Sequence, residues 1–330
     1  MLHIHNGDSS ADTAKLSSLP GEHLAFREAL VAGPAPSVLS TSDWRRIRAK
    51  HLAESYGMNL EECERELLDQ EAKLATSPEH DEVVLWFEHD LFCQVHLIYL
   101  LNWFGQKQLG QTKLSLICVG EFPGKPKFRG LGELNPDELA SLFPNRQPVT
   151  AQQLKVGAAA WEAYSSSNPH DIEKILESDT GCLPFLQAAL SAHLRRFPST
   201  TNGLGAVETS ALDATQSGSQ TFGNLFQSFG AAEPVYGLGD SQFWLTLRRL
   251  TDARQPLLGL KNGSKEAKLD NEVKPQAAFE ITDVGQRVLQ GEADFVELNG
   301  IDLWLGGVHL TSNTAWRWDS NSRRIVRSSH

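Results

Sequence analysis

Cysteine is scarce in this chain, and its cysteines are not paired in the sequence. The four are far apart, and no C-x-x-C motif joins any two of them: Cys63, Cys93, Cys118 and Cys182. Disulfide-rich folds and zinc ribbons both require closely and regularly spaced cysteines, so neither class fits this sequence. Cys93 and Cys118 lie in apolar runs, where a free thiol usually packs as a small hydrophobic group.

Long apolar segments are also absent. The longest, residues 97–104, is interrupted by Asn102 and is far shorter than the roughly 20 residues that a membrane-spanning helix needs. Residues 1–8 contain neither the basic stretch nor the apolar core of a secretory signal. We therefore expect a soluble, cytoplasmic protein with no membrane partner.

Basic residues are outnumbered by acidic ones. The 30 Lys and Arg residues face 41 Asp and Glu residues, which gives a net charge of -11. Residues 1–194 carry -10 of this charge, whereas residues 195–330 carry only -1. The balance argues against a surface that binds nucleic acid or membranes by charge alone. It leaves open a local DNA contact in the C-terminal part.

Familiar glycine-rich signatures are missing as well. The chain contains no G-x-x-x-x-G-K-[ST] phosphate loop, no G-x-G-x-x-G fingerprint and no G-x-S-x-G nucleophile elbow. It therefore matches none of the nucleotide-binding or hydrolase classes that these motifs define. The chain does have enough hydrophobic residues to form a core. Its 330 residues are 40% hydrophobic, enough to bury a core in about two domains.

The first 135 residues alternate between strand and helix patterns. Strands are expected at four places: residues 2–5, 24–31, 82–88 and 114–119. The last two are continuous apolar runs, which are typical of central strands buried on both faces, and residues 91–104 between them form a buried helix. An earlier helix, to about residue 18, would be capped by Ser9, Ser10 or Asp12. The pattern predicts a Rossmann-like α/β domain with a mainly parallel sheet.

The remaining residues form a helical middle segment, 136–198, and a C-terminal domain, 199–330. Four helices are expected in the middle segment: 137–143, 152–164, 170–177 and 183–196. The C-terminal domain opens with three helices and a hairpin with a long polar tip: 207–214, 220–231, 241–253, then 256–260 with 277–281. This is the element order of a winged helix, so we predict a winged-helix-like α+β domain. A helix begins at Thr282, and residues 301–310 and 315–326 are expected to pair as strands.

Three N-terminal segments resemble a known bacterial family. They are His5-Asn6-Gly7-Asp8-Ser9, residues 20–30 (PGEHLAFREAL) and residues 86–94 (WFEHDLFCQ). Together they are similar to the family catalogued as domain of unknown function 1835, over about the first 130 residues. Segments 239–242 and 299–310 resemble the C-terminal part of its longer members. The resemblance implies the same division into domains and carries no activity with it.

The turn at residues 6–10 follows a strand and precedes a helix, in the crevice where parallel sheets bind ligands. Backbone N–H groups there favour a phosphate or carboxylate, and we assign ligand binding to four residues of this segment: His5, Asn6, Gly7 and Ser9. Asp8 opposes a bare anion, so it would accept from a ribose hydroxyl or act in catalysis. The alternative is an ordinary turn, with positive φ at Gly7 and Asp8 or Ser9 as the helix cap.

Glu88, His89 and Asp90 end the strongest strand and should reach the same crevice. Strand alternation points Glu88 and Asp90 to one side and His89 to the other. Ionisable groups are costly to bury without partners, so we assign all three to catalysis together with Asp8. A carboxylate would be the general base and His89 the proton carrier. Alternatively, Asp90 caps the next helix and Glu88 pairs with a cation such as Arg27.

Arg27 and Glu28, on the second expected strand, are predicted to help bind the ligand, although pairing with neighbours is the simpler alternative. A zinc or iron site is an alternative for one set of side chains: His3, His5, Asp8, His89 and Asp90. The eight strand–helix units of the matching metal-dependent hydrolases are missing, so we assign no metal ligands and name no cofactor.

Two basic features remain. The loop at residues 120–130 carries Lys125, Lys127 and Arg129; it would either close over an anionic ligand or stay a solvated loop. In the C-terminal domain, the third helix would contact DNA through three side chains: Gln242, Arg248 and Arg249. The hairpin tip would add three lysines: Lys261, Lys265 and Lys268. This domain lacks the usual basic footprint, so a protein partner is an open alternative.

Taken together, these patterns predict that the protein binds a small anionic or nucleotide-like ligand in the N-terminal crevice. The second half would couple that binding to DNA or to a protein. The alternative is an enzyme, a hydrolase or transferase, that acts on a phosphorylated or nucleotide-like molecule. A structural adaptor is the third possibility.

Overall fold

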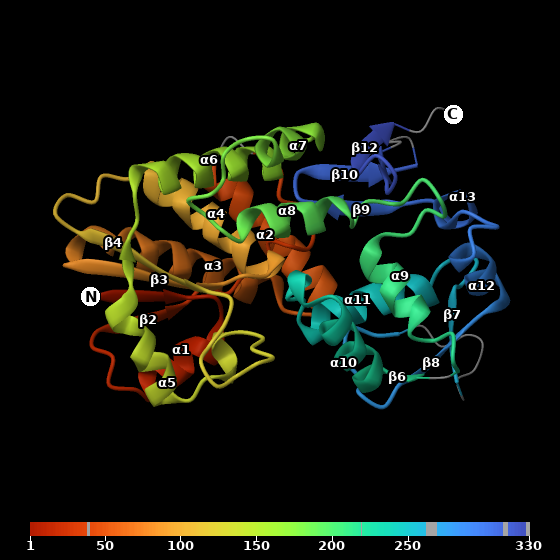
Figure 1. Ribbon diagram of the computed structural model, residues 1–330, viewed down its shortest axis with the longest axis horizontal. Helices are drawn as coiled ribbons and strands as arrows, with labels where there is room; N and C mark the ends of the chain where they lie inside the picture. The colour runs from red at the N-terminus through yellow and green to blue at the C-terminus, as the bar shows by residue number, and fades with distance from the viewer. Residues whose placement is uncertain (38–39, 219, 262–268, 313–315, 328–330) are drawn as a thin grey trace.

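The computed structural model describes residues 1–37, 40–218, 220–261, 269–312 and 316–327, and every structural statement below concerns these residues. Figure 1 shows two parts of the molecule, which we call the first half (residues 1–198) and the second half (residues 199–330). One half contains a five-stranded sheet with helices on both faces, and the other contains helices and small antiparallel sheets. The chain is therefore a mixed α/β protein, as the sequence predicts. None of its helices is both long enough and apolar enough to cross a membrane.

The large sheet has the strand order β2-β1-β3-β4-β5. Its strands are β1 (Leu2–His5), β2 (Glu22–Ala25), β3 (Glu82–Glu88), β4 (Lys113–Val119) and β5 (Gln147–Pro148). The first four run parallel, and β5 pairs with β4 in the antiparallel direction. The prediction of a mainly parallel sheet is confirmed.

The central strand β3 shows why its sequence is apolar without interruption. Val83, Leu85 and Phe87 face one layer of the core, and Val84 and Trp86 face the other; all five are fully buried. One layer is covered by α4 (Leu91–Gly105) and α6 (Ala151–Ser165), and the opposite layer by α1 (Asp8–Lys15) and α5 (Pro136–Leu142). A strand enclosed on both faces has apolar side chains throughout its middle, and in β3 only the two end residues, Glu82 and Glu88, are polar.

The first half also contains further helices and single turns of 3-10 helix. They are α2 (Thr41–Tyr56), α3 (Leu60–Ala75), α7 (His170–Leu176), α8 (Leu186–Leu194), η1 (Ser77–Glu79), η2 (Leu131–Glu133) and η3 (Phe143–Asn145). The four helices predicted between residues 136 and 198 are all present, with ends that shift by a few residues.

Two local predictions in this half are wrong. The strand expected at residues 24–31 ends at Ala25, because Glu28 turns inward to meet the buried Arg48, which also donates to the Ala29, Ala32 and Pro34 carbonyls. Arg27 and Glu28 therefore lie in a connection and not on a strand. The first helix begins directly after Gly7, whose φ is 100°, and no side chain caps it. The expected positive φ at Gly7 is confirmed, whereas capping by Ser9, Ser10 or Asp12 is not.

The second half follows the predicted order of elements. These are α9 (Ala206–Asp213), β6 (Gln220–Thr221), α10 (Phe222–Ala232), η4 (Pro234–Tyr236), α11 (Asp240–Thr251), β7 (Leu258–Leu260), β8 (Ala278–Ile281), α12 (Asp283–Leu289) and α13 (Phe295–Asn299). The three short strands form an antiparallel sheet in the order β6-β8-β7.

The C-terminal strands differ from the prediction. Residues 301–310 and 315–326 do not form two long paired strands. Each region instead folds back on itself as a hairpin, β9 (Asp302–Leu305) with β10 (Val308–Thr311) and β11 (Trp316–Asp319) with β12 (Arg324–Arg327). Gly306, with φ 63°, supplies the tight turn of the first hairpin.

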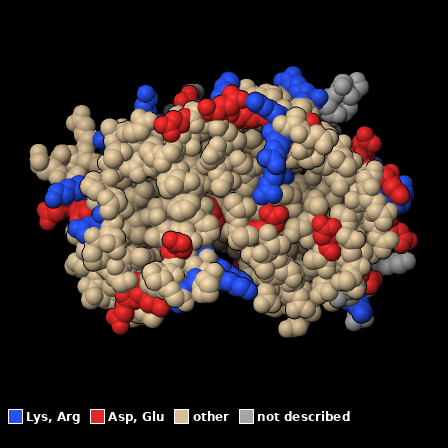
Figure 2. All heavy atoms as spheres, viewed as in Figure 1, with Lys and Arg blue, Asp and Glu red and all other residues tan. Residues whose placement is uncertain are grey.

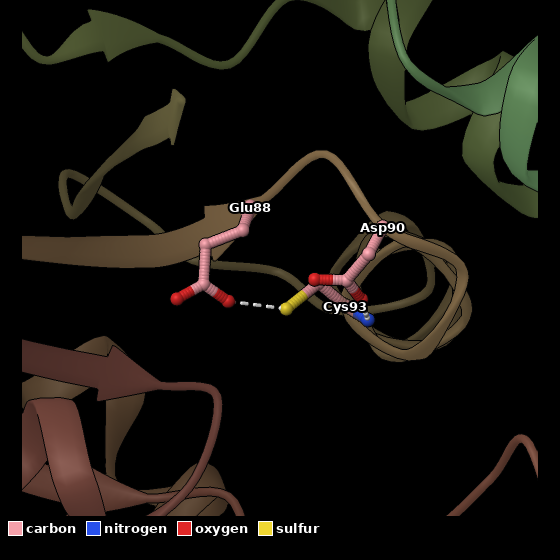
Figure 3. A group of neighbouring side chains, drawn as sticks. All are labelled: Glu88, Asp90 and Cys93. Carbon is pink, nitrogen blue, oxygen red and sulfur yellow. Dashed lines mark hydrogen bonds between the residues drawn. The ribbon is translucent and has the colours of Figure 1, made fainter. Parts of the chain in front are cut away.

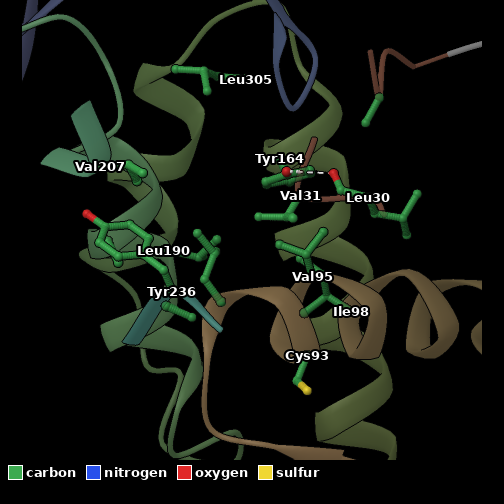
Figure 4. Packing of buried hydrophobic residues seen from close by; sticks show 14 of the residues in the cluster. Leu30, Val31, Cys93, Val95, Ile98, Tyr164, Leu190, Val207, Tyr236 and Leu305 are labelled. Carbon is green, nitrogen blue, oxygen red and sulfur yellow. Dashed lines mark hydrogen bonds between the residues drawn. The ribbon is translucent and has the colours of Figure 1, made fainter. Parts of the chain in front are cut away.

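A single apolar cluster joins the two halves. Figure 4 shows labelled members from both: Leu30, Val31, Cys93, Val95, Ile98, Tyr164, Leu190, Val207, Tyr236 and Leu305. The Tyr164 hydroxyl donates to the Leu30 carbonyl at 2.9 Å, which satisfies it inside this core. Because the cluster is continuous, the second half is packed against the first and holds a fixed place beside the carboxyl ends of the strands.

Candidate functional site

The carboxyl ends of β1 and β3 lie side by side at the centre of the sheet. β1 pairs with β2 on one side, while β3 pairs with β4 on the other. The connections that leave these two strands therefore lead in opposite directions, and a crevice opens between them. Asn6 follows β1 and Glu88 ends β3, so the two segments that the sequence singled out meet at this point.

A cavity of about 390 Å³ occupies this position, and we call it the crevice. The first half contributes residues drawn from 6–10, 88–93 and 129–133, and the second half contributes residues drawn from 226–242. The crevice is therefore enclosed between the two halves. The sequence indicated that residues of the first half lie at this crevice, but not that residues 226–242 of the second half do.

Glu88 is the central acidic group of the crevice. It is 8% exposed, and its two carboxylate oxygens accept from different donors: Oε1 from the Leu131 N–H at 2.5 Å and Oε2 from the Cys93 thiol at 2.5 Å. Figure 3 shows the second contact at the end of β3. Within the described ranges, no Lys or Arg lies within ion-pair distance of Glu88. The predicted alternative pairing with Arg27 is wrong, because Arg27 binds Asp8.

Asp90 begins α4 and caps it. Its Oδ1 accepts from the Cys93 N–H at 2.8 Å, so the predicted capping role is confirmed. Gly237 of the second half lies directly against this carboxylate: a Cβ at Gly237 would stand 2.1 Å from Asp90 Oδ1, and φ there is 59°. Only glycine permits both the conformation and the close approach. Asp90 is therefore both a helix cap and one of the contacts between the two halves.

A chain of hydrogen bonds fixes the orientation of Asn6. The Leu30 N–H donates to His96 Nε2 at 3.2 Å, so the His96 proton resides on Nδ1, which donates to Asn6 Oδ1 at 2.5 Å. Asn6 Nδ2 in turn donates to Cys93 Sγ at 2.6 Å. Burial lowers the pKa of His96 to about 3, which keeps the ring neutral. His96 was not predicted; the signal for it is a histidine in the mostly apolar helix α4.

Burial sets the protonation of the three acidic groups. It raises the pKa of Glu88 to about 7, with the nearby Asp90 charge adding to the effect. Burial also raises the pKa of Asp90, and it raises the pKa of the Cys93 thiol well above its ordinary value. Glu88 can therefore exchange a proton near neutral pH, as a general acid or base does. Cys93 stays a thiol, which is a poor nucleophile.

Glu88, Asp90 and Cys93 are also the residues that could hold a metal ion. One ligand atom from each lies within 4.8 Å of the others. A set of two carboxylates and one thiolate suits zinc, although the thiol must first lose its proton.

The predicted histidine metal set does not form. His3 uses both ring nitrogens, accepting from Trp86 Nε1 at 3.0 Å and donating to the Pro20 carbonyl at 2.8 Å. His5 is hydrogen bonded to His23 and stacks on Trp86. Burial lowers the pKa of His3 to about 4 and that of His5 to about 2. Both histidines are buried residues of β1 and serve the packing of the core.

The predicted site residues divide into two groups. Five of them line the crevice: Asn6, Ser9, Glu88, His89 and Asp90. Five do not: His5, Gly7, Asp8, Arg27 and Glu28. Asp8 and Arg27 form an ion pair at the surface, with Arg27 Nε 2.8 Å from Asp8 Oδ1. Glu28 is buried with Arg48, at 2.7 Å between Oε1 and Nη2. The charges of Arg27 and Glu28 are therefore neutralised by other residues of the protein, and the alternative that these two pair with neighbours is confirmed.

The basic loop borders the crevice. A second cavity of about 800 Å³, the loop cavity, is lined by residues 120–129 and shares His89 and Arg129 with the crevice. Lys125 is paired with Glu138 at 3.2 Å. The side chains of Lys127 and Arg129 form no ion pair in the described part of the chain, although the Arg129 backbone N–H donates to the Glu133 carboxylate at 3.1 Å. Figure 2 shows basic side chains gathered at the mouth between the two halves, over this loop.

The residues assigned to DNA contact point into the molecule. Gln242, Arg248 and Arg249 line a third cavity of about 440 Å³, the junction cavity, between α11, α2 and β9. Their hydrogen-bond partners are, in the same order, Tyr56, Asn271 and Glu208. Lys265 and Lys268 of the predicted hairpin tip lie outside the described residues. The predicted recognition face of α11 is thus occupied by contacts within the chain.

No family model matches this chain, and no curated protein is significantly similar to it.

Proposed function

We propose that the crevice binds a small phosphorylated molecule that carries hydroxyl groups, such as a nucleotide or a sugar phosphate. The observation that carries the proposal is that buried carboxylates and unpaired basic side chains occur at the same place. Glu88 and Asp90 are buried acceptors that form no ion pair in the described residues, whereas the side chains of Arg129 in the same crevice and Lys127 in the adjoining loop cavity are cations that form none either. Hydroxyl groups donate well to carboxylates, and a phosphate accepts well from Lys and Arg.

The strand order of the large sheet supports this choice of position. The order 2-1-3-4-5 is that of one class of doubly wound, Rossmann-like folds, which bind ligands where the strand order reverses. The resemblance of residues 1–130 to domain of unknown function 1835 remains a prediction beside it.

The second half would respond to the ligand. Its order of helix, strand, two helices and two strands, with β8 between β6 and β7, supports a winged-helix-like module. Gly237 lies on Asp90, so a ligand that enters the crevice changes the contact between the halves. We propose that this contact couples the ligand to a protein or DNA partner of the module.

Catalysis is the second candidate function, and one observation favours it. Burial gives Glu88 a pKa of about 7, which is suited to a general acid or base in a hydrolase or transferase. Such an enzyme would lose turnover on Glu88→Gln while the fold persists. Unchanged turnover in that variant would remove Glu88 from the chemistry.

Thermal shift with a set of related probes tests the proposal. The probes are AMP, ribose 5-phosphate, ribose and inorganic phosphate. A ligand at ten times its Kd stabilises the native state by about 1.4 kcal/mol, which for this chain length raises Tm by about 2 °C. We expect the phosphorylated sugars to produce this shift and the two fragments to produce less.

Variants locate the binding. Glu88→Gln should weaken the response to AMP and ribose 5-phosphate, and Lys127→Ala with Arg129→Ala should weaken it further. Lys113→Ala is the matched control, because Lys113 is exposed at the opposite end of β4. No shift with either phosphorylated sugar, or a shift that survives both sets of changes, would contradict the proposal.

A further inference from the structure

The crevice and the loop cavity meet at a group of residues that line both of them. We call this group the neck, and its members are His89, Arg129, Gly230 and Pro234. The crevice has a volume of about 390 Å³ and the loop cavity a volume of about 800 Å³. Each volume lies within the range, roughly 300–1,000 Å³, of sites that hold a small organic molecule. There is therefore room for part of a ligand on both sides of the neck.

Gly230 forms the side of the neck that belongs to the second half. It lies in α10, one turn after Phe226, so the two residues are on the same side of the helix. Phe226 and Gly230 both line the crevice, whereas Gly230 and Ala231 line the loop cavity. A side chain at residue 230 would therefore point toward the space where the two cavities meet.

The protein's own packing does not require a glycine at this position. The other glycines of the crevice wall are required, because a Cβ at Gly130, Gly132, Gly237 or Gly239 would stand within 3 Å of a side-chain oxygen. A Cβ at Gly230 would meet no heavy atom of the described residues within 4 Å, apart from its chain neighbours and its own helix backbone. Alanine is also more favourable than glycine within a helix. A ligand that passes close to the backbone of α10 accounts for the glycine.

The charge of the lining changes from one side of the neck to the other. Four acidic side chains and one basic side chain line the crevice: Glu88, Asp90, Glu133, Glu233 and Arg129. One acidic and three basic side chains line the loop cavity: Glu121, Lys125, Lys127 and Arg129. Of these, Lys125 is paired with Glu138. Arg129 is the one neck residue with a permanent charge, and a guanidinium group is a strong donor to phosphate. The neck therefore suits a phosphate better than the acidic interior of the crevice does.

The loop cavity extends beyond the neck and has an apolar part. Phe122, Pro123 and Pro126 line it together with Phe128, and the ring centroids of the two phenylalanines are 6.3 Å apart. Apolar and aromatic surfaces beside a few polar groups are typical of sites that hold the organic part of a ligand. A ligand that ended with its phosphate at the neck would leave this surface uncovered.

We infer that the ligand is a diphosphate with an organic group at each end, and that Gly230 is the residue that admits the second group. One hydroxylated group lies in the crevice beside Glu88 and Asp90, the diphosphate lies at the neck beside Arg129, and the second group lies in the loop cavity. Nucleotide sugars and dinucleotides belong to this chemical class. The inference rests on the proposed function, since it adds a second part to the ligand proposed for the crevice.

Calorimetry with AMP, ADP and ADP-ribose tests the inference. ADP-ribose is AMP joined to ribose 5-phosphate through a diphosphate. Its charge is close to that of AMP, whereas ADP is more negative and lacks the second ribose. Because linked fragments bind more tightly than separate ones, we expect the Kd of ADP-ribose to be at least about tenfold lower than that of AMP. It should also be lower than the Kd of ADP.

Substitutions in α10 locate the second group. Gly230→Leu places a side chain in the neck, so the ratio of the two Kd values, AMP to ADP-ribose, should fall from about 10 to about 1. Gly230→Ala should raise the urea midpoint, because alanine favours the helix, and should still lower this ratio. Gly223→Ala is the matched control: it makes the same exchange in the same helix, at an exposed position outside both cavities. It should leave the ratio unchanged.

The outcomes separate this inference from the proposed function. If neither AMP nor ADP-ribose binds, the proposed function fails and the inference fails with it. If AMP binds and ADP-ribose binds no more tightly than AMP or ADP, the crevice remains a ligand site and the second group is refuted. If the ratio survives Gly230→Leu, the ligand does not pass Gly230 and the inference is overturned. Should Gly230→Leu not fold, the comparison of Gly230→Ala with Gly223→Ala decides in the same way.

Discussion

The cost of burying Glu88 should be visible in the stability of the protein. Burial raises the pKa of Glu88 from 4.5 to about 7. Between these two values the folded state keeps the proton and the unfolded state loses it, so the free energy of unfolding falls as pH rises. Above pH 7 the full cost applies. Each pKa unit corresponds to 1.36 kcal/mol, which gives a cost of about 3 kcal/mol.

Glu88→Gln removes the charge and keeps the shape. The amide oxygen can still accept from the Leu131 N–H, whereas the thiol contact of Cys93 is replaced by a weaker N–H···S contact. That exchange costs about 1 kcal/mol at most. At about pH 8 the variant should therefore be more stable than the parent protein by about 2 kcal/mol. At about pH 4 the parent side chain is protonated in both states, so the variant should be equal or slightly less stable.

Urea unfolding, followed by tryptophan fluorescence at several pH values between about 4 and 8, measures this difference. Glu121→Gln is the matched control: Glu121 is exposed on the loop after β4, and its replacement should change stability by less than about 0.5 kcal/mol at every pH. The reasoning is refuted if Glu88→Gln is less stable than the parent at pH 8, or if its difference from the parent does not grow with pH.

Three further predictions concern the contacts around the crevice. Asp90→Ala should cost about 1 kcal/mol through the lost cap of α4, while Asp90→Asn should keep the cap and show ligand effects alone; equal destabilisation by the two variants would contradict this. Gly237→Ala should destabilise the protein by about 1–3 kcal/mol and weaken AMP binding, because its Cβ would displace the Asp90 carboxylate; an unchanged urea midpoint would contradict that contact. Arg48→Met should cost about 3–5 kcal/mol by leaving Glu28 buried and unpaired, and Glu28→Gln in addition should recover much of the loss. Non-recovery in a double-mutant cycle would contradict the pairing.

Local patterns in the sequence predicted most of the secondary structure of the first half. The continuous apolar run of five residues from Val83 to Phe87 favours a strand enclosed on both faces, and β3 is such a strand. The alternative interpretation of Asp90, a cap between that strand and the helix after it, is confirmed. These rules succeed because the residues that satisfy one another are within four positions in the chain.

The partners of charged groups depended on contacts that no local pattern contains. Arg27 and Glu28 are adjacent in the sequence, yet one pairs with Asp8 at the surface and the other with Arg48 in the core. Arg248 faces a cavity because α2 and β9 lie opposite it. A sequence pattern predicts the type of a side chain and the face of the helix or strand on which it lies. It does not predict which residues of other segments contact that side chain.

The sequence by itself determined where the crevice begins, because parallel strands bring their carboxyl ends to one edge wherever the helices fall. Asn6, Glu88 and Asp90 were placed together on that ground. Only the tertiary structure decided what closes the crevice: Leu131 on Glu88 and Gly237 on Asp90. Leu131 reaches Glu88 from the segment after β4, and Gly237 reaches Asp90 from the second half. The burial of Glu88 is what raises its pKa to about 7.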